Sequence, residues 1–185
     1  MQVAGFVLVG GRSSRMGSDK ARLPVNSRLL VEEVAESVRE VAGNVALVGE
    51  SRKYQDLKLT CLDDLRPGAG PLAGIEAALA AERGDPNLIV ACDIAGVSSA
   101  LLDRLVTQSQ IRRVSCVVAR ESNGTIHPLC GVWNRDCLPF VQDALDHGRF
   151  RVLDILTQVG AEFVYADCPI HNVNTPEEWG RWLNH

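Results

Sequence analysis

Val3-Ala4-Gly5-Phe6-Val7-Leu8-Val9-Gly10-Gly11, at the start of the sequence, is an unbroken apolar run that a pair of glycines closes. A run without polar alternation is typical of a strand buried on both faces, as in the parallel sheets of α/β proteins. A polar loop follows, from Gly10 to about Pro24. Ligands bind beyond the carboxyl ends of the strands in such sheets, so we expect chemistry in this loop.

Helical and extended patterns alternate through the rest of the chain. Leu30, Val34, Val38 and Val41 recur at the spacing of an amphipathic helix. We expect further strands at 44–48, 58–62, 87–91, 114–119, 128–133 and 162–165, and further helices at 71–82, from 98 or 99 onward, at 135–146, at 152–159 and after the capping sequence Thr175-Pro176-Glu177-Glu178. This alternation predicts the α/β class: a single three-layer α/β/α domain over residues 1–185, with a Rossmann-like, mostly parallel sheet.

Composition narrows the classes of function. The chain has 185 residues, of which 46% are hydrophobic and 23% charged, which excludes a disordered or coiled-coil protein. Only 5% are aromatic, and 19 basic against 23 acidic residues leave a net charge of -4. Nucleic-acid binders are more often basic, and no apolar run reaches the ~18 residues of a transmembrane helix. We therefore expect no nucleic acid and no membrane as partners, and a small molecule as the carrier of any phosphate.

The six cysteines lie in apolar stretches and form no CxxC pair. We also expect no signal peptide, since the first apolar run of this sequence lacks a basic flank. We therefore expect reduced, mostly buried thiols in a cytoplasmic protein.

Cations and glycines are concentrated in the loop after the first strand. Glycines let the backbone approach a phosphate, and consecutive amides form an anion-binding concavity. Arg12, Arg15 and Lys20 add positive charge there. The spacing fits neither the P-loop, which needs lysine where Ser18 follows Gly17, nor the dinucleotide fingerprint. The loop therefore predicts a phosphate site of a third kind, with a solvated surface loop as the alternative.

At this point the chain resembles a known family. Leu8 to Lys20 is similar to the pattern L-x-G-G-x-S-x-R-M-G-x-D-K of small nucleotidyltransferases, and its paired glycines resemble the molybdenum cofactor guanylyltransferases more than their cytidylyl relatives. Three further places agree, in order along the chain: Gly70-Pro71-Leu72-Ala73-Gly74, Ala91-Cys92-Asp93, and His127-Pro128 followed by Asn172-Val173-Asn174-Thr175-Pro176-Glu177-Glu178.

The resemblance implies a nucleotide-diphospho-sugar transferase-like fold and an enzymatic activity. That activity is the Mg²⁺-dependent transfer of GMP from GTP to molybdenum-molybdopterin, with release of pyrophosphate. Transient contacts with molybdenum-insertion proteins or recipient molybdoenzymes are implied as well. Two alternatives remain open: a molybdopterin cytidylyltransferase or related small nucleotidyltransferase, and an inactive nucleotide-binding accessory protein.

Asp93 is the candidate metal ligand. It ends an apolar strand, where an unpaired carboxylate is costly, and Mg²⁺ prefers such hard oxygen ligands. The resemblance places the metal-binding aspartate here too, and a capping or loop aspartate is the alternative. The family usually has proline two residues later, whereas this chain has Ile94-Ala95, which removes a residue that would stiffen the turn.

The resemblance also assigns the remaining roles. It names Arg15, Lys20 and Asp93 as catalytic, and Leu8, Val9, Gly10, Lys20, Asp63 and Asp93 as GTP-binding. A carboxylate such as Asp63 can accept two N–H bonds from guanine. The adjacent Asp64 is the alternative, and both can be plain turn residues. We expect His127 to have a structural or substrate-contacting role, and Asn172 and Asn174 to shape the side of the cleft that takes the second substrate.

Overall fold

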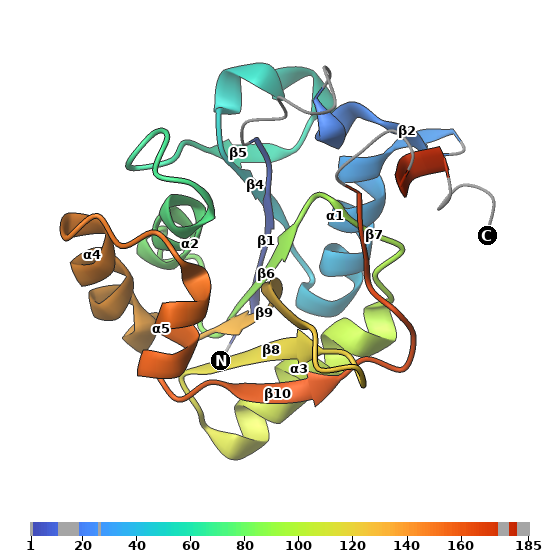
Figure 1. The fold of residues 1–185 in the computed structure, drawn as a ribbon. Helices are drawn as coiled ribbons and strands as arrows, with labels where there is room; N and C mark the ends of the chain where they lie inside the picture. The colour runs from blue at the N-terminus through green and yellow to red at the C-terminus, as the bar shows by residue number, and fades with distance from the viewer. Residues whose placement is uncertain (1, 11–18, 26, 174–177, 181–185) are drawn as a thin grey trace.

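The computed structural model describes residues 2–10, 19–25, 27–173 and 178–180 (Figure 1). Within them, a seven-stranded sheet has the order β10-β8-β9-β6-β1-β4-β5. The strands are β1 (Ala4–Leu8), β4 (Ala46–Val48), β5 (Thr60–Leu62), β6 (Asn87–Ala91), β8 (Cys116–Arg120), β9 (Ile126–Trp133) and β10 (Glu162–Tyr165). Only β9 among these strands runs antiparallel to its neighbours, so the predicted mostly parallel sheet is confirmed.

Helices cover both faces of the sheet, as Figure 1 shows. One face carries α1 (Leu30–Ala42) and α3 (Ser99–Arg112), and the other carries α2 (Pro71–Ala80), α4 (Leu138–Asp146) and α5 (Val152–Gln158). Strand β1 contributes side chains to the hydrophobic core on each face of the sheet. Val7 packs on the side of α1, and Phe6 and Leu8 pack on the side of α2. The prediction of a strand buried on both faces is thus correct, and the three-layer α/β/α class is confirmed.

Local signals explain where several helices begin and end. Ser98 caps α3 by accepting a hydrogen bond from the amide of Leu101, and Pro71 occupies the first turn of α2. Gly43 ends α1 with a positive φ of 72°, a conformation that glycine adopts at little cost. No helix in the described part of the chain is long and apolar enough to cross a membrane. Four of the six cysteines are buried, as expected, and all six are free thiols.

Several short elements were not predicted from the sequence. A hairpin of two short strands, β2 (Pro24–Val25) and β3 (Arg28–Leu29), follows the glycine loop. A second small ladder pairs β7 (Ile94–Ala95) with β11 (His171–Asn172) in antiparallel fashion. The predicted helix at 135–146 divides into a 3-10 turn at Arg135–Cys137 and α4. Of the predicted last helix, the described residues 178–180 are helical, and Thr175 to Glu177 lie outside the described residues.

Candidate functional site

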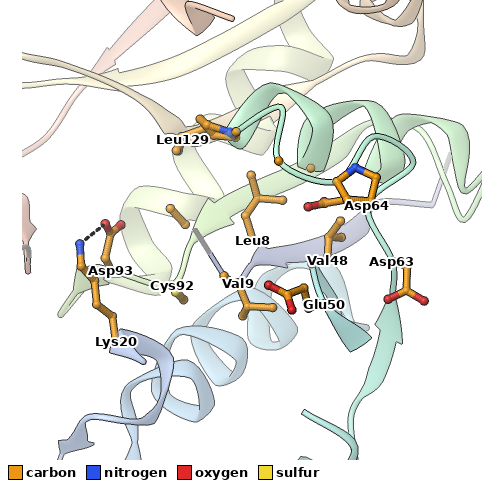
Figure 2. A pocket seen from close by; sticks show the side chains of 18 of the residues that line it. Leu8, Val9, Lys20, Val48, Glu50, Asp63, Asp64, Cys92, Asp93 and Leu129 are labelled. Carbon is orange, nitrogen blue, oxygen red and sulfur yellow. Dashed lines mark hydrogen bonds and ion pairs between the residues drawn. The ribbon is translucent and has the colours of Figure 1, made fainter. Parts of the chain in front are cut away.

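A cavity of about 940 Å³ opens beyond the carboxyl ends of β1, β4, β5 and β6. Its position is the one expected for ligands of an open α/β sheet. Figure 2 shows side chains from these four strand ends converging on it. Charged residues that line it are Lys20, Glu50, Arg52, Asp63, Asp64 and Asp93.

Lys20 and Asp93 form one end of this cavity. Lys20 begins the 3-10 helix η1 (Lys20–Arg22), and Asp93 follows β6. The lysine Nζ lies 3.5 Å from Oδ2 of Asp93, and the two side chains are 18% and 28% exposed (Figure 2). Tertiary structure thus joins two residues that are 73 positions apart in sequence. The pair is accessible from the cavity, so both groups can meet a bound anion or cation there.

The turn after Asp93 is held by tertiary pairing. Ile94 and Ala95 form β7, are 2% and 3% exposed, and pair with β11. The amide of Val173 also donates a hydrogen bond to the carbonyl oxygen of Asp93 at 2.9 Å. These contacts restrain the turn where the family pattern would use a proline. The departure at Ile94-Ala95 therefore leaves Asp93 on a fixed segment.

Three carboxylates, those of Glu50, Asp63 and Asp64, line the end of the cavity beyond β4 and β5. Asp63 is exposed, and its Oδ1 accepts a hydrogen bond from the Ser51 amide at 2.8 Å, which lowers its pKa. Asp64 is half-buried, and burial raises the pKa of its carboxyl group, with the nearby charges of Asp63 and Glu50 adding to the effect. The two adjacent aspartates therefore occupy different environments.

The Gly70-to-Gly74 motif places the start of α2 against the cavity. Gly70 precedes the helix with a positive φ of 74°, and Gly74 sits where an added Cβ would lie 3.1 Å from a methyl group of Leu8. Glycine at 74 thus lets α2 approach β1 closely. Because Gly70 and Pro71 both line the cavity, the positive end of the α2 dipole is directed at its contents.

Most of the predicted site residues meet in this cavity. Its lining includes Leu8, Val9, Gly10, Lys20, Asp63, Asp64 and Asp93. Arg12, Arg15 and Asn174 lie outside the described residues. Glu50 and Arg52 also line the cavity but were not predicted from the sequence. Their positions shortly after the end of β4 were the signal that could have identified them.

His127 is not among the residues that line the cavity, although Leu129 on the same strand is. It is buried on β9, and its Nε2 is 2.7 Å from Oε1 of Glu121. The same Glu121 oxygen accepts the amide of Ile170 at 3.4 Å, next to β11. These contacts agree with a structural role, one of the two expectations for His127. Asn172 lies within β11 itself.

Comparisons with known proteins agree with this geometry. The model of the MobA-like NTP transferase domain family matches residues 5–162. A molybdenum cofactor guanylyltransferase from Cereibacter sphaeroides is 35% identical, over 98% of this chain and 95% of the relative. One from Xanthomonas euvesicatoria is 31% identical, over 97% and 94%. The crystal structure of molybdopterin-guanine dinucleotide biosynthesis protein A from Archaeoglobus fulgidus superposes with a TM-score of 0.83 at 22% identity, covering 100% of this chain and 97% of that one.

Proposed function

Because this chain belongs to the MobA-like NTP transferase family, we propose that it transfers GMP from GTP to molybdenum-molybdopterin. The observation that carries the proposal is the cavity, which has a lysine and an aspartate at one end and carboxylates at the other. Such a site can hold a triphosphate at the first end and a purine base at the second. The guanylyltransferase relatives, which align over nearly their whole length, supply the choice of substrates.

The chemistry requires positioning and charge neutralisation rather than a covalent nucleophile. An oxygen of the terminal phosphate of molybdopterin attacks the α-phosphorus of GTP. The new P–O bond forms as the bond from the α-phosphorus to the bridging oxygen breaks, and pyrophosphate leaves with that oxygen. Backbone groups of Leu8, Val9 and Gly10, the cation of Lys20 and the amino end of α2 stabilise the charge on the phosphates. We assign Arg15 to the same task.

Mg²⁺ fits the residues at the Lys20 end of the cavity. This ion is commonly held by one or two carboxylates together with substrate phosphates and water. Asp93 is a partly exposed carboxylate at the cavity, and no cluster of three or more metal-ligating side chains occurs among the described residues. Asp93 would therefore hold the ion jointly with the triphosphate. When bound, Mg²⁺ supplies neutralisation of the phosphate charge.

Asp64 is our choice for the residue that recognises guanine. A carboxylate accepts both the N1–H and an N2–H of guanine, a pattern that cytosine and adenine do not offer. Asp63 is occupied by the Ser51 amide, whereas Asp64 is half-buried in the cavity wall beside Gly74. The desolvated carboxylate gains more from two donated hydrogen bonds than the exposed one does. Asp64 therefore takes the role that the resemblance gave first to Asp63.

The wider setting follows from the same assignment. We propose that residues 1–185 act as a single nucleotidyltransferase domain in the cytoplasm. The protein would receive molybdenum-molybdopterin from, or hand the finished cofactor to, molybdenum-insertion proteins or recipient molybdoenzymes through transient contacts.

Incubation of the protein with molybdenum-molybdopterin, Mg²⁺ and each nucleoside triphosphate in turn tests the proposal. Mass spectrometry then identifies the dinucleotide product, and pyrophosphate release gives the rate. We expect the guanine dinucleotide, formed from GTP in preference to CTP and ATP. A preference for CTP would replace the guanylyl assignment with a cytidylyl one. Nucleotide binding without any transfer would instead identify an accessory protein.

A further inference from the structure

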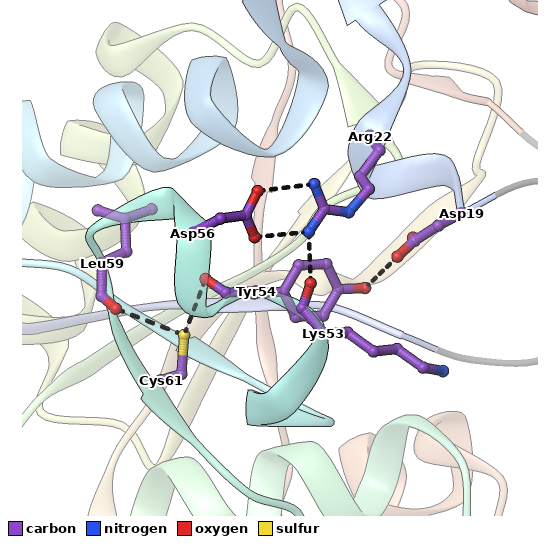
Figure 3. Close-up of polar contacts among 7 residues, drawn as sticks. All are labelled: Asp19, Arg22, Lys53, Tyr54, Asp56, Leu59 and Cys61. Atoms are coloured by element: carbon purple, nitrogen blue, oxygen red, sulfur yellow. Dashed lines mark hydrogen bonds and ion pairs between the residues drawn. The ribbon is translucent and has the colours of Figure 1, made fainter.

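Tyr54 connects the core to the residue that precedes Lys20. It lies in the segment between β4 and β5 and is 0% exposed. Its hydroxyl group donates a hydrogen bond to Oδ2 of Asp19 at 2.7 Å (Figure 3). Tyr54 is absent from the cavity lining, so its hydroxyl group is placed to act on Asp19 rather than on a bound ligand.

The two carboxylate oxygens of Asp19 accept hydrogen bonds from two different groups. Oδ2 accepts from Tyr54, and Oδ1 accepts from the amide of Ala21 at 3.1 Å, which caps η1. The second bond sets the conformation of the turn that contains Lys20. The first bond ties this turn to a buried ring. The turn from which Lys20 reaches toward Asp93 is therefore hydrogen-bonded to a residue 35 positions away in sequence.

Arg22 supports the same connection from the other end of η1. Its guanidinium group pairs with both carboxylate oxygens of Asp56, at 2.7 and 3.0 Å, and bonds the carbonyl oxygen of Lys53 (Figure 3). It also lies over the Tyr54 ring, 5.8 Å from its centroid. The Arg22–Asp56 pair is largely exposed, and exposed ion pairs contribute little to stability. The Tyr54–Asp19 bond, by contrast, is part-buried, with the Tyr54 ring fully buried, so it is less exposed to competition from water than the Arg22–Asp56 pair is.

The Tyr54 hydroxyl group remains a donor at every pH at which the protein would work. Burial and the hydrogen bond to the Asp19 carboxylate both raise the pKa of Tyr54 well above its usual value. The phenol therefore stays protonated, and the bond to Asp19 is charge-assisted.

We propose that Tyr54 is a positioning residue for nucleotidyl transfer, which acts through Asp19 to orient Lys20 toward the triphosphate. The inference rests on the proposed function, because it takes Lys20 as the phosphate-binding cation. It also goes beyond that function, since Tyr54 becomes part of the phosphate site although it does not line the cavity.

Tyr54→Phe tests the proposal, because it removes the hydroxyl group and keeps the buried ring. We expect kcat to fall about tenfold, as for the loss of one charge-assisted hydrogen bond, with a smaller change in the KM for GTP. Tyr165→Phe is the matched control, since Tyr165 is 56% exposed and only its carbonyl oxygen, which the substitution keeps, bonds Arg104. We expect the control to retain the parent kcat. An unchanged kcat in Tyr54→Phe would overturn the proposal.

A double variant shows whether Tyr54 acts through Lys20. In a Lys20→Ala background, Tyr54→Phe should cause no further loss of kcat, because there is no lysine left to orient. A second tenfold loss there would indicate a general structural role and overturn the proposal.

A measurement without nucleotide separates this inference from the proposed function. Hydrogen exchange of the Ala21 amide should be faster in Tyr54→Phe than in the parent or in Tyr165→Phe, since the Asp19 cap is loosened. If the parent protein transfers no GMP, the proposed function fails, yet the exchange experiment still tests the connection from Tyr54 to Asp19. Equal exchange rates at Ala21 would overturn the connection itself.

Discussion

The two ends of the cavity differ in charge and in the way the chain builds them. At one end, Lys20 and Asp93 come from distant elements and meet across 3.5 Å. At the other end, Glu50 and the adjacent pair Asp63 and Asp64 come within two residues of the ends of β4 and β5, two neighbouring parallel strands. For the nucleoside triphosphate that we propose as substrate, this asymmetry favours one orientation, with the anionic phosphates at the end that holds the lysine and the N–H donors of the base at the end that holds the three carboxylates.

The contacts that hold the charged residues in place also differ between the two ends. Lys20 depends on the Tyr54–Asp19 bond, and Asp93 depends on the pairing of β7 with β11. Asp63, by contrast, is held by a hydrogen bond from the amide of Ser51, which follows the neighbouring strand β4. We therefore expect substitutions at the Lys20 end to cost more activity than substitutions at the carboxylate end. The following changes test that ranking, beginning with the largest effect.

Asp93→Ala should lower kcat/KM for GMP transfer about a thousandfold, because it removes the carboxylate that would hold Mg²⁺. The measurement is product formation from GTP over a series of Mg²⁺ concentrations. Asp103→Ala, at an exposed position of α3, is the matched control and should behave as the parent does. A variant that transfers GMP as well as the parent would show that the metal assignment is wrong.

Lys20→Ala should lower kcat/KM about a hundredfold, because the cation that neutralises the phosphates is lost while the metal ligand remains. Steady-state kinetics with GTP measure this effect. Lys58→Ala is the control, since Lys58 is exposed and lies outside the cavity lining. The comparison of the two ends fails if Lys20→Ala loses less activity than the carboxylate variants below.

Asp64→Asn should reduce kcat/KM for GTP about tenfold to thirtyfold, since an amide accepts only one of the two guanine N–H bonds with its single oxygen. Asp63→Asn keeps an acceptor for the Ser51 amide and should stay within about threefold of the parent. ITP, which lacks the N2 amino group, provides a direct readout. The parent should prefer GTP over ITP, and Asp64→Asn should lose this preference. If Asp63→Asn loses it instead, guanine recognition belongs to Asp63.

Asp64→Asn should also change stability, in the opposite direction to activity. The pKa of Asp64 is raised in the folded protein, so its ionisation opposes folding. The penalty is absent well below the unfolded-state pKa of about 3.9, and it grows as pH rises from there through the raised folded-state pKa. Thermal unfolding should therefore give a higher Tm for Asp64→Asn than for the parent at pH 7, and equal values in strong acid. A lower Tm at pH 7 would contradict the burial of this carboxylate.

Much of the site was predictable because its residues follow strands. The apolar run that became β1 pointed to the glycine loop, and the strands that became β5 and β6 pointed to Asp63, Asp64 and Asp93. A buried strand has a strong local pattern, and the carboxyl ends of neighbouring parallel strands meet at one edge of a sheet. Glu50 was missed because none of the motifs that carry the resemblance covers the residues after β4.

The sequence by itself determined the α/β class, the strand that is buried on both faces and the edge of the sheet at which the cavity opens. These depend on local periodicity, which neighbouring residues already contain. Only the tertiary structure decided which aspartate is buried, that β9 runs antiparallel, and that Tyr54 holds Asp19. The two-residue strands β2, β3, β7 and β11 are too short to show a period in the sequence. The burial of a carboxylate or a hydroxyl group depends on segments that are distant in sequence and pack against it in the fold.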